Sequence, residues 1–231
     1  MFFFDPMYFV FALPPLLLVW YAQSRVTGAF NKYRQIRNMA NMTGAQVAQT
    51  LLRSNGLYDV SVQAVQGNLT DNYNPTNRVL SLSSDVYGSP SVAALGVAAH
   101  EVGHVMQQAT GYAPLKARGA LVPAVNMGST LGYLFFFAGL VINASGLVWL
   151  GVAAFSMGLV FALVTLPVEF NASGRALAML KSNGLVSVDE FSGAKSVLDA
   201  AALTYVAAVA SALGNLLYFV FVALGMGGRR R

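Results

Sequence analysis

The chain has 231 residues, of which 56% are apolar and only 10% are charged, and its mean hydropathy is +0.57. This composition excludes an ordinary soluble domain and indicates an integral membrane protein. The net charge of +5 does not indicate nucleic-acid binding, because lysine and arginine are sparse and half of them follow the first apolar run or end the chain. Since there is no cysteine, disulfides and thiolate metal ligands are excluded, and any bound metal needs histidine or carboxylate ligands.

The first apolar run predicts a membrane anchor over residues 7–23. No basic residue precedes it and several follow, which is the reverse of a cleaved signal peptide and places the carboxyl end of the anchor in the cytoplasm. Residues 24–42 then predict a basic, amphipathic helix on the membrane surface. The basic residues in this stretch are Arg25, Lys32, Arg34 and Arg37.

Residues 24–119 are polar enough for a small aqueous or interfacial domain. Thr43 can cap a helix that stops at Gly56. Alternating apolar and polar residues predict half-buried strands at 60–65 and 78–83, with a turn-rich loop between them.

His100 and His104 are the only histidines in the chain, and they lie in the sequence HEVGH. On a helix, positions i and i+4 share a face, so both imidazoles can bind one metal ion. Glu101 then lies where it can act as a general base on a water held at the metal. The Ala-, Val- and Gly-rich run at 92–99 predicts that this helix is buried on most sides.

Two further apolar runs form a predicted transmembrane hairpin over residues 120–167. A helical segment, 168–200, follows, and a last transmembrane helix with a basic tail occupies 201–231. Because the hairpin crosses the membrane twice, residues 24–119 and 168–200 lie on the same side of it. Eleven of the chain's fourteen lysines and arginines fall in these two segments, which predicts that both lie in the cytoplasm. Arg229–Arg231 conflict with this rule if the last run crosses fully, whereas a re-entrant run would keep them inside.

A catalytic zinc needs a third protein ligand, and here that ligand must be a carboxylate. Glu169 is the best candidate, because an apolar run ends there and small residues follow on its helical face. The alternative is a glutamate that only caps the helix or reaches the interface. The small residues that would let the two helices approach are Ala172, Ser173 and Ala176 on one and Gly96 and Gly103 on the other. The other candidate ligands are Asp59, Asp71, Asp85, Asp189, Glu190 and Asp199.

This site predicts metal-assisted peptide hydrolysis, with Glu101 passing the water proton to the leaving amine. The strand before the HEVGH helix could pair with a substrate backbone through a free edge, or be an ordinary sheet strand. Its residues are Arg78, Val79, Leu80, Ser81, Leu82 and Ser83. Candidate oxyanion donors are Tyr73, Tyr112 and Arg175, and Asn171 could hydrogen-bond a ligand.

Three stretches resemble the neutral zinc metallopeptidases of bacterial membranes, the YugP type. They are SSDVYGSPSVAALGVAAHEVGHVMQQATGYAPLKAR, NYNPTNRVLSLS and LPVEFNASGRA. The resemblance extends over most of the chain and implies a multi-pass peptidase of the bacterial inner (plasma) membrane, of the gluzincin kind. It implies one Zn²⁺, ligands His100, His104 and Glu169, and Glu101 as the catalytic residue.

Two residues depart from the pattern of the family. Asn171 stands where the family usually has an aspartate, and Asn72 stands where it usually has a histidine. The loss of the aspartate is expected to weaken the support of a ligand histidine and leaves the ligands themselves intact.

We expect a mainly α integral membrane protein of about four transmembrane helices, with a small α+β zincin-like domain that carries a short sheet and the HExxH helix. The predicted function is a membrane-anchored zinc endopeptidase that cleaves peptides or unfolded or membrane proteins at the cytoplasmic face. The alternatives are an intramembrane metalloprotease and a scaffolding protein with a structural or vestigial metal site. The expected partners are a peptide or protein substrate and the lipid bilayer, with no nucleic acid; a homo-oligomer or a membrane partner stays open.

Overall fold

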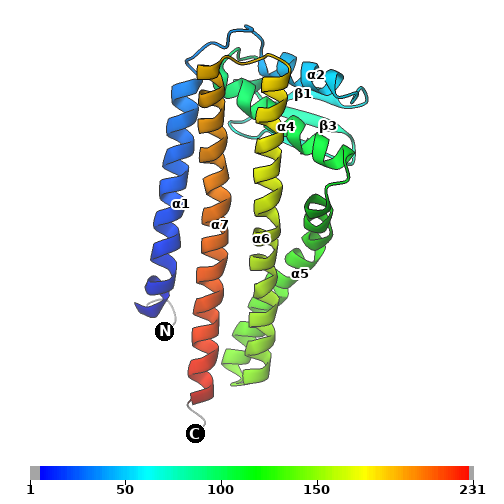
Figure 1. The fold of residues 1–231 in the computed structure, drawn as a ribbon. Helices are drawn as coiled ribbons and strands as arrows, with labels where there is room; N and C mark the ends of the chain where they lie inside the picture. The colour runs from blue at the N-terminus through cyan, green and yellow to red at the C-terminus, as the bar shows by residue number, and fades with distance from the viewer. Residues whose placement is uncertain (1–5, 229–231) are drawn as a thin grey trace. The chain divides into compact units, whose positions relative to one another are not determined.

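A computed structural model describes residues 6–228 of the chain, and these residues are mainly helical (Figure 1). The long helices are interrupted by three short strands and one short helix, all between residues 61 and 87. In chain order the elements are α1 (Pro6–Tyr33), α2 (Gly44–Ser54), β1 (Ser61–Val65), β2 (Asn72–Asn74), β3 (Val79–Ser83), α3 (Ser84–Tyr87), α4 (Val92–Ala109), α5 (Ala113–Val141), α6 (Ser145–Ser182) and α7 (Val188–Gly228). The predicted fold class is confirmed.

Within residues 6–228, four helices are long and apolar enough to cross a membrane: α1, α5, α6 and α7. This agrees with the four predicted spans. The α1 helix runs without a break to Tyr33, so the prediction of a separate surface helix over 24–42 is wrong. A re-entrant last run would need a break in α7, and α7 is one continuous helix. The Arg229–Arg231 tail, on which the predicted conflict rested, lies outside the described residues.

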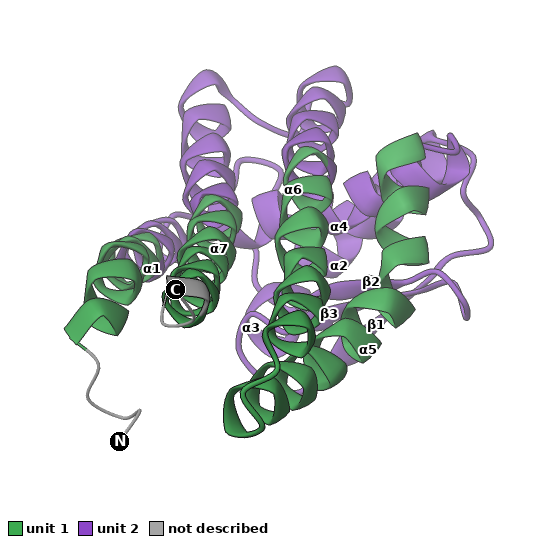
Figure 2. Cartoon of the chain, turned by 90° about the horizontal axis from the view of Figure 1, so that it is seen from below, with its two compact units in different colours: residues 1–22, 113–167, 204–231 green, residues 23–112, 168–203 purple. Residues whose placement is uncertain are grey.

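The chain divides into two compact units (Figure 2). The first, here called the helical unit, consists of Met1–Ala22, Ala113–Pro167 and Thr204–Arg231. The second, the mixed unit, consists of Gln23–Tyr112 and Val168–Leu203 and contains the whole sheet. Both α6 and α7 begin in one unit and continue into the other, so each unit is assembled from distant parts of the chain.

Glycines and aromatic rings hold the helical unit together. A Cβ added at Gly151 of α6 would lie 2.7 Å from the backbone nitrogen of Phe136 of α5, so glycine allows these two helices to touch. Phe155 stacks on Phe219 of α7 with ring centroids 4.3 Å apart. Such pairs stabilise packing beyond the apolar area that they bury.

A three-stranded sheet in the order β1-β3-β2 forms one part of the mixed unit. The β3 strand pairs in parallel with β1 and antiparallel with β2, which lies in the predicted loop and was missed. The prediction that residues 78–83 offer a free edge to substrate is therefore wrong, because β3 is the central strand. Beyond the three β2 pairs, the Ser83 N–H donates to Asp71 Oδ1 at 2.8 Å.

The α4 helix runs through the core of the mixed unit. As predicted, residues 92–99 are buried, apart from a partly exposed Val97. The α2 helix packs against it, with a Thr43 capping box at its start and the predicted apolar face, Val47, Leu51 and Leu52, turned inward. A helix enclosed in this way is a rigid support for side chains that point from it.

Candidate metal centre

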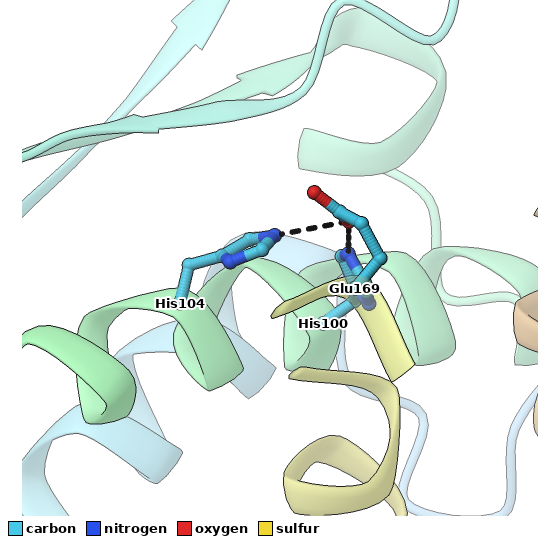
Figure 3. Close-up of side chains that lie close together, drawn as sticks. All are labelled: His100, His104 and Glu169. Atoms are coloured by element: carbon cyan, nitrogen blue, oxygen red, sulfur yellow. Dashed lines mark ion pairs between the residues drawn. The ribbon is translucent and has the colours of Figure 1, made fainter. Parts of the chain in front are cut away.

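The α4 helix presents His100 and His104 side by side, one turn apart (Figure 3). Their ring centroids lie 4.8 Å apart and the rings are nearly perpendicular. Glu169, on α6, meets both rings: its Oε2 lies 3.3 Å from His100 Nε2 and 3.4 Å from His104 Nε2. The carboxylate is 2% exposed, so it lies in a place that water hardly reaches.

The three donor atoms fit a tetrahedral zinc ion. Ligand atoms about 2.0–2.2 Å from such an ion lie about 3.3–3.6 Å from one another. The two glutamate-to-histidine distances agree with this spacing, and all three donor atoms lie within 4.8 Å of one another. Two imidazoles and one carboxylate are also a donor set that catalytic zinc uses, with one coordination position left for water.

Small residues allow α6 to approach α4. A Cβ added at Gly103 would lie 2.5 Å from the carbonyl oxygen of Ala172, a distance that no real contact allows. Ala172 and Ala176 are fully buried. The predicted close approach is confirmed at Gly103, but Gly96 instead faces Ala194 of α7.

Glu101 follows His100 directly on α4 and is 7% exposed. Burial raises the pKa of its carboxyl group above the ordinary value, and His100 and His104 oppose this by lowering it. A carboxylate with a raised pKa holds a proton more readily near neutral pH, as a general base must.

Each histidine has a hydrogen-bond partner at its second ring nitrogen. His100 Nδ1 lies 3.1 Å from Ser173 Oγ, and His104 Nδ1 lies 3.0 Å from Gln107 Oε1. Neither partnership was predicted from the sequence. The signal for one of them is Gln107 itself, a polar residue three positions after His104 on an apolar helix, whereas Ser173 was predicted only as a small residue that lets the helices approach.

The remaining predicted residues lie around this centre without joining the donor group. Asn171 contacts Gln107 and Arg175 and reaches the histidine only through Gln107, which corrects the prediction of a direct bond to a ligand. The Tyr73 hydroxyl donates to Gln108, and the Arg175 guanidinium lies 5.9 Å from the centre of the Tyr112 ring. Asn72 donates to the Thr70 carbonyl.

Most of the other candidate carboxylates have different partners. Asp71 binds Ser83, Asp59 pairs with Arg78, Asp85 pairs with Arg34, Asp199 pairs with Lys195, and Glu190 accepts from the backbone of Met39 and Ser187. Among the described residues, His100, His104 and Glu169 are the ones whose donor atoms converge.

Comparison with known proteins agrees with this geometry. The sequence model of the family described as "Putative neutral zinc metallopeptidase" matches residues 8–224. The chain belongs to this family.

One relative that the chain is similar to is the "Putative membrane protease YugP" of Bacillus subtilis (strain 168). It is 44% identical over 219 residues, which cover 94% of this chain and 97% of the relative. No solved structure matches the chain. Together with the four apolar helices, the family membership identifies a membrane protein of the zinc metallopeptidase class.

Proposed function

We propose that this protein is a zinc-dependent endopeptidase of the bacterial plasma membrane that hydrolyses peptides or unfolded or membrane proteins at the cytoplasmic face. His100, His104 and Glu169 would hold one zinc ion, in the manner of gluzincins. The convergence of these three donor atoms, at distances that suit a tetrahedral ion, is the observation that carries the proposal.

In the proposed reaction, a zinc ion bound by these residues would acidify a water molecule and polarise the scissile carbonyl group. Glu101 takes the proton as the water oxygen attacks the carbonyl carbon. It then delivers that proton to the leaving amine as the C–N bond breaks, so its carboxylate is restored. The buried position of Glu101 keeps bulk water from competing for this proton.

The β2 strand is the better place for an extended substrate. It is an edge strand of the sheet and lies beside α4, because Tyr73 on β2 binds Gln108 on α4. A peptide backbone can add to such an edge by main-chain hydrogen bonds, which recognise many sequences equally. This would suit a protease that acts on unfolded chains.

The test compares wild type with Glu101→Gln, using purified full-length protein, metal analysis and a fluorophore-labelled unfolded protein as substrate. We expect equal zinc content and hydrolysis at least about 100-fold slower in the variant, the contribution expected of a general base. Zinc in both proteins with cleavage by neither would instead support a scaffold with a structural metal. Zinc content unchanged by His100→Ala would overturn the metal site.

A further inference from the structure

Gln107 is a glutamine with no exposed surface, and both ends of its amide are engaged. Its Oε1 lies 3.0 Å from His104 Nδ1. Its Nε2 donates to the Val168 carbonyl oxygen at 2.7 Å and to Asn171 Oδ1 at 3.1 Å. The Val168 carbonyl belongs to the peptide group that joins Val168 to Glu169. One side chain on α4 therefore touches a histidine ligand and the backbone of the carboxylate ligand.

Arg175, at the end of this network away from His104, determines which group donates in each hydrogen bond. Arg175 Nε can only donate, and it lies 2.8 Å from Asn171 Oδ1, so that atom of Asn171 must be the oxygen. An oxygen accepts, so Gln107 must present its NH₂ group to Asn171. The Val168 carbonyl requires the same orientation, because a flipped amide would place two oxygens together.

This orientation of the Gln107 amide determines the protonation of His104 Nδ1. Because the NH₂ group of Gln107 donates to Val168 and Asn171 of α6, its Oε1 faces the imidazole, and an amide oxygen can only accept a hydrogen bond. His104 Nδ1 must then carry a proton, so in the neutral ring that binds a metal the lone pair lies on Nε2, the atom that faces Glu169. His100 differs, since the hydroxyl of Ser173 can donate or accept and imposes no direction.

We propose that Gln107 is a positioning residue that holds His104 in the metal-binding tautomer and fixes α6 at Glu169, with Asn171 and Arg175 fixing Gln107 in turn. This inference rests on the proposed zinc site. It also explains why Asn171 is acceptable where the family pattern has an aspartate: the network needs an acceptor oxygen at this position, and the amide of Asn171 supplies one.

The first test measures the zinc affinity of the full-length protein by competition with a chelator. Gln107→Met keeps the volume and removes the hydrogen bonds, and we expect it to weaken zinc binding about 10–100-fold, as removal of such partners does. The control is Gln108→Met, which makes the same substitution at the neighbouring, exposed glutamine and should leave the zinc affinity at the wild-type value.

The second test is spectroscopic and uses the fact that the chain has only two histidines. Protein labelled with [¹⁵N]histidine and loaded with zinc gives two imidazole spin systems, which His100→Ala assigns. We expect His104 with Nδ1 protonated, and a Nδ1 proton that exchanges faster with water in Gln107→Met while that of His100 is unchanged. A protonated Nε2 in wild-type His104 would overturn the inference.

The two proposals fail in different ways. If wild-type protein binds no zinc, the metal site itself is wrong. If wild type binds zinc and Gln107→Met binds it equally tightly, the site stands and the positioning role of Gln107 is wrong.

Discussion

Glu169 supplies the only negative charge in the donor group, and the two imidazoles share it. Replacing it by glutamine keeps the shape and removes the charge. Loss of a residue that only hydrogen-bonds a metal ligand weakens metal binding by up to about 100-fold, and we expect Glu169→Gln to weaken zinc binding by more than that. Isothermal titration calorimetry or competition with a chelator, on full-length protein, would measure the affinity.

The matched control is Glu190→Gln, because Glu190 lies outside the donor group and binds backbone N–H groups. Its zinc affinity should equal that of wild type. Equal affinity of Glu169→Gln and wild type would contradict the assignment of the third ligand.

Asp71 gives a prediction on pH. Burial raises its pKa above the ordinary 3.8, against the lowering effect of its hydrogen bonds with Ser83. The folded protein thus binds this proton more tightly than the unfolded chain, and stability is lost as the pH rises through the folded pKa. Asp71→Asn should therefore melt at a higher temperature than wild type at pH 7, and the difference should shrink towards pH 4. Thermal unfolding of metal-free protein in detergent measures this, and a constant difference would contradict it.

Among the residues of the candidate site, the sequence predicted those whose role follows from the pattern of a single helix. The HEVGH spacing alone brings two rings to one helix face, and Glu169 was favoured by the small residues that follow it. Gln107 and Ser173 could not be assigned, because their partners depend on the register of α4 against α6. Spacing along one helix does not determine that register.

The contact between α4 and α6 determines whether the three donor atoms meet. Gly103→Ala would place a methyl group against the Ala172 carbonyl and push the helices apart. We expect weaker zinc binding and a loss of stability of about 1–3 kcal/mol, as for other overpacked sites. Chelator competition and thermal unfolding would measure the two effects.

Gly174→Ala on α6 is the control, since no atom lies within 4 Å of the added Cβ. In a helix interior this change should be neutral or stabilising by about 0.5–1 kcal/mol. If both variants behaved alike, the close approach at Gly103 would not be what aligns the ligands.

The order of the strands in the sheet could not be predicted from the sequence pattern of each strand. Alternation at 60–65 and 78–83 predicted two strands correctly, but alternation does not give strand order. Three residues of β2, between turn-forming neighbours, carry too short a pattern to be recognised, and their pairing makes β3 central.

For the whole molecule, the absence of cysteine makes the membrane topology directly testable. A cysteine at Ile142, an exposed residue in the turn just after α5, should react with a membrane-impermeant thiol reagent added to spheroplasts. A cysteine at Gln66, an exposed residue of the mixed unit, should react only after the membrane is opened. The reverse pattern would contradict the cytoplasmic orientation, and equal reactivity would contradict the hairpin.

The apolar composition predicted the membrane class, and the apolar runs of about 20 residues predicted the number of spans. Neither of them predicted the lengths of the helices. The 38 residues of α6 extend for about 57 Å, well beyond a hydrocarbon core of about 30 Å. A hydropathy pattern shows where the chain leaves the hydrocarbon core, but it does not show whether the helix continues beyond that point.

The separation of the ligands along the chain also bears on biosynthesis. Two donor atoms are made with α4, and the third is made only after both helices of the hairpin, α5 and most of α6, have been translated. A nascent or truncated chain that ends before Glu169 therefore lacks one of the three donor atoms. Under the proposed zinc mechanism, a chain truncated before Glu169 would have no activity, and hydrolysis would begin only once the hairpin has been synthesised.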